Sequence, residues 1–198
     1  MGAMGAMGAL PMARGLILAL TAAGVMAASP IEKCRPLTPR IPPEHISDLR
    51  FRDVKVMMAM GDSITAGFAI SNLPFTSPGL VYSTGDTPGA ITMGNFLDTL
   101  NKAGGGVKRG HKYDVAVSGD VVQGMSRQAE RLIHVLKEDT SINFEKDWKV
   151  LTIWIGANNE CPSCHGADGN QPPAYEQELQ QALELLYAGI PRTYVNLV

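Results

Sequence analysis

The stretch at residues 54–68, VKVMMAMGDSITAGF, decides the fold of this chain. Its first seven residues form a short apolar run, which is typical of a buried strand, and a polar turn with a glycine follows directly. The same succession recurs downstream. Further apolar runs occupy residues 113–117 (YDVAV), 150–155 (VLTIWI) and 193–198 (TYVNLV). The sequence therefore predicts four strands.

Amphipathic segments lie between these runs. Residues 125–137 and 174–188 each carry apolar side chains at i, i+3, i+4 and i+7, which form one face of a helix. A further helix is expected from Ile91 onward. Strands that alternate with helices favour an α/β fold, in which helices flank both faces of a parallel sheet. A length of 198 residues with 45% hydrophobic content fits a single globular domain.

Small polar turns follow the first three predicted strands. They are Gly61-Asp62-Ser63, Ser118-Gly119-Asp120 and Gly156-Ala157-Asn158. In open α/β sheets the ligand crevice lies outside the carboxyl ends of the strands, so these turns predict one site. Ser63 also begins a helical pattern, which places its hydroxyl in the crevice and its N–H at the positive end of a helix. Taken alone, Ser63 is better explained as a helix N-cap.

The first 28 residues are typical of a targeting segment. A Met-Gly-Ala repeat precedes Arg14, an apolar run at 16–28 and small residues at its end. This order predicts a secretory signal peptide cleaved near Ala27 or Ala28, and the run is shorter than the ~20 apolar residues of a membrane span. We therefore expect a secreted, extracellular or lumenal protein. Residues 29–50, which are rich in proline, are expected to form an extended lead-in to a domain at 51–198.

Charge and cysteine content narrow the choice of partners. The net charge of −2 offers no basic surface, which excludes nucleic acid as a partner. The chain has three cysteines: Cys161 and Cys164 form a C-x-x-C pair, and Cys34 is left over. Disulfides persist in an oxidising compartment, so the odd cysteine needs a partner outside this sequence or carries a free thiol.

The motif around Ser63 resembles a known family. Residues 61–67, GDSITAG, are similar to the block that names the GDSL, or SGNH, hydrolases, and Gly119 and Asn158 follow in that family's order. The resemblance implies the SGNH hydrolase fold, a flavodoxin-like parallel sheet, with Ser63 as the nucleophile. It further implies that the Ser63 N–H, the Gly119 N–H and the Asn158 side chain form an oxyanion hole. Asp62 is expected in a supporting role.

A longer match points to one branch of the family. Residues 127–164, from RQAERL to ECPSC, and residues 191–198, PRTYVNLV, resemble phospholipase B. This resemblance implies hydrolysis of acyl esters of phospholipids and lysophospholipids, without a metal or an organic cofactor. The expected partner is a lipid ester substrate, with contact to a membrane surface through that substrate. Because relatives carry a similar C-x-x-C, we expect Cys161 and Cys164 to form a local disulfide beside Asn158.

The chain also departs from the family pattern. Asn159 stands where the family commonly has Asp, and Asp114 where it commonly has Asn. Asp120 places a carboxylate beside an oxyanion donor, and its charge would oppose catalysis if it pointed inward.

The family's base is missing from the sequence. That base is a histidine in a late Asp-x-x-His motif, and none of His45, His111, His134 and His165 matches it. The sequence thus predicts a partial hydrolase domain at 51–198 without its C-terminal part, inactive by itself.

Two other functions stay open at this point. A catalytically inactive relative that binds lipid would also lack the base. The residues Cys161 to His165 read C-x-x-C-H, which is the attachment motif of c-type haem, although one short motif has a high false-positive rate. A zinc site would need two more ligands than this motif supplies nearby.

Overall fold

Three parallel strands form the centre of the computed structural model, which describes residues 35, 37–71, 73–164 and 171–198. Within this part, the sheet has the order β1 (Val54–Gly61), β2 (Trp148–Trp154) and β3 (Thr193–Leu197). The register pairs Met60 with Ile153 and Leu151 with Val195. The predicted signal segment and Cys34 lie outside the described residues. Three of the four predicted strands are confirmed.

The prediction of a strand at residues 113–117 is wrong, because this segment does not form a regular strand. The segment follows the free side of β1, where the Val115 N–H donates to the Ala59 carbonyl (3.0 Å) and the Val117 N–H to the Gly61 carbonyl (3.1 Å). The Gly61 N–H, which a continuous ladder would use, instead donates to the Gln128 side chain (2.9 Å). A long-range side chain therefore interrupts the pairing.

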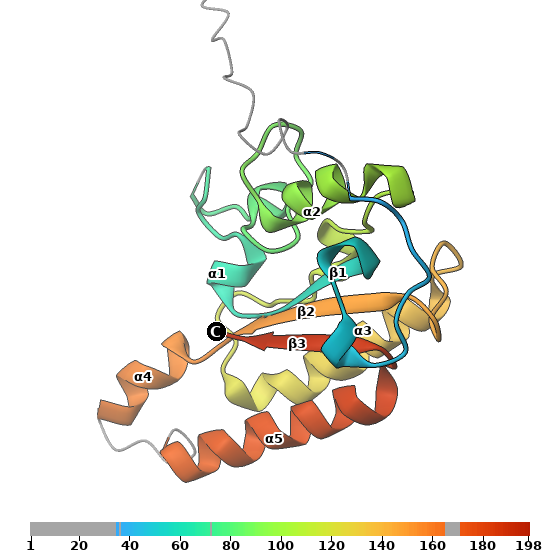
Figure 1. Cartoon of the computed structure of the whole chain (residues 1–198). Coiled ribbons are helices and arrows are strands. Elements are labelled where there is room, and N and C mark those ends of the chain that lie inside the picture. Colours follow the sequence, from blue (N-terminus) through green and yellow to red (C-terminus); the bar gives the residue numbers. More distant parts are fainter. Residues whose placement is uncertain (1–34, 36, 72, 165–170) are drawn as a thin grey trace, which may run out of the picture.

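Helices cover both faces of the sheet, as Figure 1 shows. α3 (Met125–Glu138) and α5 (Pro172–Gly189) pack side by side on one face, and α2 (Met93–Asn101) lies on the other. Alternate β1 side chains serve the two faces: Met58 and Met60 join the cluster under α3 and α5, whereas Met57 packs with Leu97 of α2. The predicted α/β fold with a parallel sheet and flanking helices is confirmed.

Shorter helices occupy the loops. α1 (Ser63–Ala66) is a single turn after β1, and α4 (Ala157–Cys164) follows β2. The sequence predicted only a turn at this second place; the helix forms because the Gly156 carbonyl accepts the N–H groups of Asn159 (2.8 Å) and Glu160 (3.2 Å). The 3-10 turns are η2 (Ile46–Asp48), η3 (Phe51–Asp53), η4 (Pro78–Leu80), η5 (Lys102–Gly104), η6 (His111–Tyr113) and η7 (Val122–Gly124).

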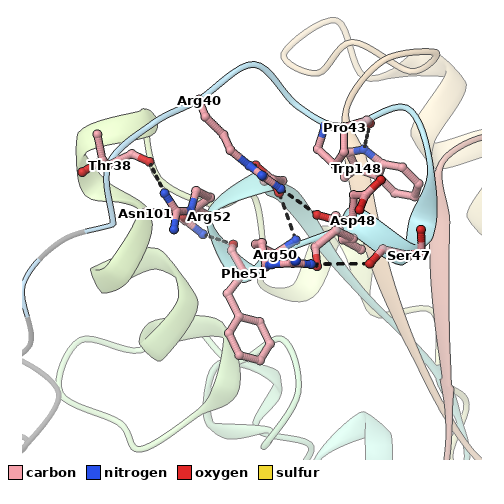
Figure 2. A network of polar contacts seen from close by, with 12 residues as sticks. Thr38, Arg40, Pro43, Ser47, Asp48, Arg50, Phe51, Arg52, Asn101 and Trp148 are labelled. Carbon is pink, nitrogen blue, oxygen red and sulfur yellow. Dashed lines mark hydrogen bonds and ion pairs between the residues drawn. The ribbon is translucent and has the colours of Figure 1, made fainter.

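The described part of the lead-in is held against the amino ends of the strands. The Trp148 indole N–H at the start of β2 donates to the Pro43 carbonyl (2.7 Å). The Arg40 guanidinium donates to both carboxylate oxygens of buried Asp53 (3.1 and 2.8 Å), and Arg52 reaches the Thr38 carbonyl (3.2 Å). Figure 2 shows these contacts, which we call the amino-end network.

Candidate active site

The carboxyl ends of the central segments meet at one edge of the sheet. Gly61, the last residue of β1, pairs with Trp154 on one side and accepts the Val117 N–H on the other. The three predicted turns therefore start from one level of the sheet. A direct contact joins two of them, because the Asn158 side-chain amide donates to the Asp120 carbonyl (2.7 Å). In Figure 1 the first turns of α1 and α4 project from this same edge.

Ser63 lies half-buried at the first position of α1. Asp62, not Ser63, is the N-cap: its fully buried carboxylate accepts the Ile64 N–H (2.9 Å). The interpretation of Ser63 as a mere N-cap is therefore wrong. The supporting role of Asp62 in the reaction stays a prediction. Among the described residues, no group accepts the Ser63 N–H in a hydrogen bond, so this donor at the start of α1 is available.

Close packing explains the glycine that precedes this turn. Gly61 has φ +154°, and a Cβ at this position would overlap the carbonyl oxygen of Trp154. A Cβ at Gly61 would also overlap the side chain of Thr65 in α1, whose hydroxyl donates to the Trp154 carbonyl (3.4 Å). Only glycine lets β1, β2 and α1 approach one another this closely, which fixes where Ser63 begins its helix.

Gly119 lies in an exposed turn with its backbone in the left-handed region, at φ +84°. A Cβ there would meet no atom within 4 Å, so the conformation and not the packing favours glycine. The described residues provide no acceptor for its N–H. Asn158 is half-buried, and its amide has a second N–H besides the one bonded to Asp120. That these groups converge on one oxyanion stays a prediction.

Gln128 organises this edge, and sequence reasoning missed it. Its buried side chain accepts the Gly61 N–H (2.9 Å), donates to the Gly61 carbonyl (2.9 Å) and donates to the Asp120 carboxylate (2.7 Å). The available signal was its place on the buried stripe of α3, three residues after Met125 and four before Leu132. A polar side chain at such a position needs partners.

The carboxylate of Asp120 is turned toward α3. It accepts hydrogen bonds from Gln128 and from the Arg127 guanidinium (3.3 Å to each oxygen), and only 9% of the side chain is exposed. The Arg127 charge offsets the negative charge that the sequence placed beside Gly119.

Asn159 suits its position as an amide. Its buried side chain accepts the Val122 N–H (3.0 Å) and donates to the Gln123 side-chain oxygen (3.3 Å). An aspartate would keep the first bond but has no N–H for the second. The departure from the family at this residue therefore ties α4 to η7.

Asp114 lies buried beside the edge, below the turn of Gly119. Its carboxylate accepts the Ala116 N–H (3.1 Å) and the Thr84 hydroxyl (3.4 Å). Burial raises the pKa of Asp114 to about 6. Burial and the charge of Asp114 together raise the pKa of Tyr82 to about 12.

No histidine of the described part is hydrogen-bonded to Ser63. None of the three has a hydrogen bond to it: His45 contacts Ser47 in the lead-in (2.8 Å), and exposed His134 faces Glu138 on α3 (3.3 Å). His111 is exposed and lines a cavity of about 230 Å³ together with Ala66. The fourth, His165, lies outside the described residues.

The cysteine motif is only partly visible. Cys164 ends α4 with an exposed free thiol, and the side chain of Cys161 lies outside the described part. The local disulfide and the haem motif therefore stay predictions. Within the described ranges, no three His, Cys, Asp or Glu side chains are grouped so that they could hold a metal ion.

Comparisons with known proteins agree with the motif at this edge. The family described as GDSL-like lipase/acylhydrolase matches residues 57–198. Membrane-associated phospholipase B1 from Rattus norvegicus is 33% identical over 174 residues, which cover 79% of this chain and 12% of the relative. The Mus musculus protein is 32% identical over 173 residues (78% and 12%), and the Homo sapiens protein 32% over 174 (79% and 12%).

The extent of these matches is uneven. The chain spans 12% of the length of these phospholipase B1 relatives. No solved structure matches it. The family match nevertheless covers β1 from Met57 onward, β2, β3 and all three turns of the edge. The chain therefore belongs to the GDSL-like lipase/acylhydrolase family.

Proposed function

We propose that this chain carries the nucleophile and oxyanion donors of an acyl ester hydrolase that acts on phospholipids or lysophospholipids. One observation carries the proposal. The buried Asp62 cap and the glycine at 61 hold Ser63 half-buried at the edge that Gly119 and Asn158 share. The family supports ester hydrolysis, and the relatives' name, phospholipase B1, supports the lipid class.

In the proposed reaction, the Ser63 hydroxyl oxygen attacks the carbonyl carbon of the ester and its proton passes to a base. The oxyanion that forms accepts hydrogen bonds from the Ser63 N–H, the Gly119 N–H and the Asn158 amide, each typically worth about 2.7–4 kcal/mol in the transition state. The bond to the alcohol then breaks, the alcohol leaves with a proton, and water releases the acyl group from Ser63.

The experiment has to supply a base for the Ser63 proton. No described histidine is bonded to Ser63, so we expect this chain to turn over esters slowly and to respond to a base added from outside. Without a triad member, a serine hydrolase retains a rate about 10³–10⁴-fold above that in water. Imidazole in the buffer can act as the missing base.

The experiment measures hydrolysis of a short-chain p-nitrophenyl ester and of a lysophospholipid, with and without imidazole. We expect a component that rises with imidazole and disappears in Ser63→Ala. Ser118→Ala, which removes the hydroxyl next to Gly119 at the same edge, is the matched control and should retain it. Equal rates in the parent chain and Ser63→Ala would refute the hydrolase. Lysophospholipid binding without any Ser63-dependent release would favour the lipid-binding relative.

A further inference from the structure

Exposed apolar side chains gather on the loop that follows α1. Between residues 64 and 75, five large apolar side chains are at least 40% exposed, and the two most exposed are Leu73 (74%) and Phe75 (68%). The other three are Ile64, Phe68 and Ile70. Single exposed apolar residues are ordinary, but five close together on α1 and the short loop after it form a patch that is typical of an interaction site. We call residues 68–76, as far as they are described, the α1 hairpin.

Backbone hydrogen bonds hold the α1 hairpin in shape. The Ala69 N–H donates to the Phe75 carbonyl (3.0 Å), and Phe68 and Thr76 form an antiparallel bridge. The Phe68 N–H donates to the carbonyl of Ser63 itself (2.9 Å), which fixes the hairpin to the proposed nucleophile. In Figure 1 this loop extends from α1 away from the sheet. Its apolar side chains are thus presented outward by an ordered backbone.

The hairpin lies in an uncharged stretch of the sequence. From Ser63 to Gly85 the sequence has no Asp, Glu, Lys, Arg or His, in a chain with 18% charged residues. A partner recognised by ion pairs is therefore unsuited to this surface. A stable protein partner typically covers about 20–30 residues on each side, which is far more than this hairpin offers. Shallow insertion of a few apolar side chains into a lipid surface needs neither charge nor a large area.

We propose that the α1 hairpin inserts into the surface of aggregated lipid and thereby places Ser63 next to that surface. Insertion itself rests on the exposed side chains and the absence of charge. Delivery of an acyl ester to Ser63 rests in addition on the proposed function. The ester would then enter the edge from the lipid side and would not need to cross water as a monomer.

The test is flotation of the whole chain with phosphatidylcholine vesicles. We expect Leu73→Ser/Phe75→Ser to lower the vesicle partition coefficient by at least about tenfold. Ile41→Ser/Tyr187→Ser is the matched control, because both of its side chains are over 90% exposed and lie away from the hairpin, on the lead-in and on α5. This control should bind like the parent chain. Should the double variant fail to fold, Leu73→Ser alone replaces it.

Salt and lipid charge sharpen the result. We expect binding to persist in high salt and without anionic lipid, since the hairpin has no charge. Equal binding of the hairpin variant and the parent, binding that salt abolishes, or a self-associated parent that the hairpin variant makes monomeric would each overturn the proposal. Ser63→Ala should still bind vesicles. A chain that binds through the hairpin yet shows no Ser63-dependent hydrolysis would refute the proposed function alone.

Discussion

The two ends of the sheet are built differently. At the amino end, most of the polar groups are paired, for example Asp53 with Arg40 and the Trp148 indole with a carbonyl of the lead-in. Even the buried ammonium of Lys149 donates to three carbonyls, those of Phe144 (2.6 Å), Asp147 (2.8 Å) and Pro191 (3.1 Å). Among the described residues there, the buried Nε of Arg52 has no partner. At the carboxyl end, the N–H groups of Ser63 and Gly119 have no acceptor among the described residues.

This difference between the two ends of the sheet suggests that one end serves stability and the other serves the proposed reaction. N–H groups near the surface that no protein group accepts bond to water, and a ligand can replace that water as the acceptor. The carboxyl end combines those donors with Gly119 in the left-handed region and an uncharged apolar hairpin next to Ser63. We propose that the amino end contributes to the stability of the domain and that the carboxyl end receives the substrate of the proposed function. Changes at the two ends should therefore have separable effects.

The largest effect is expected at the carboxyl end, from loss of one oxyanion donor. Asn158→Ala should slow reaction of Ser63 with a phosphonate ester by roughly two to three orders of magnitude, because such a donor contributes about 2.7–4 kcal/mol. The urea midpoint should change little, since Asn158 is only half-buried and its described side-chain hydrogen bond is the one to the Asp120 carbonyl. The rate of phosphonylation is measured by quenching samples at set times and determining the modified fraction by mass spectrometry. An unchanged rate with unchanged stability would remove Asn158 from the site.

A smaller, pH-dependent effect is expected from Asp114 beside the site. Because its pKa is raised to about 6, the folded chain holds a proton between about pH 4 and 6 that the unfolded chain has lost. Stability from this group is thus present at low pH and falls as pH rises through that window, by at most about 3 kcal/mol. Asp114→Asn should therefore gain stability relative to the parent between pH 4 and pH 7. Urea unfolding at both values checks this, and a pH-independent difference would contradict it.

The amino end should affect stability alone. Asp53→Ala removes the acceptor of two Arg40 bonds and of the Arg50 N–H (2.9 Å), which we expect to lower the free energy of unfolding by about 2 kcal/mol. Asp53→Asn keeps one acceptor oxygen and should lose less. The rate at which folded protein reacts with the phosphonate should match the parent in both variants. A slower reaction would show that the two ends are coupled.

Sequence periodicity was sufficient for the parts of the fold governed by local pattern. β1, β2, β3, α3 and α5 follow from apolar runs and helical spacing, since burial of one face dictates both. The prediction of a strand at 113–117 was wrong because the side chain of Gln128, which is distant in sequence, accepts the Gly61 N–H. The sequence predicted a turn in place of α4, because the first hydrogen bonds of this helix go to the backbone carbonyl of Gly156, which no side-chain pattern reveals.

The sequence was sufficient to predict at which edge of the sheet the candidate site residues lie. Placing Ser63, Gly119 and Asn158 together needed only the rule that parallel strands end on one side. The direction of the Asp120 carboxylate was not predictable, because it depends on Gln128 and Arg127 from α3. The apolar hairpin was missed because exposure of Leu73 and Phe75 is a property of the folded surface.

We propose above all that Ser63 at the carboxyl edge is the reactive nucleophile. Its most direct test is incubation of the chain with a phosphonate ester in imidazole buffer, followed by peptide mapping by mass spectrometry. We expect one phosphonyl group per chain, located on Ser63, absent from Ser63→Ala and retained in Ser118→Ala. Modification spread over several serines, or labelling of Ser63→Ala at the parent's rate, would contradict it.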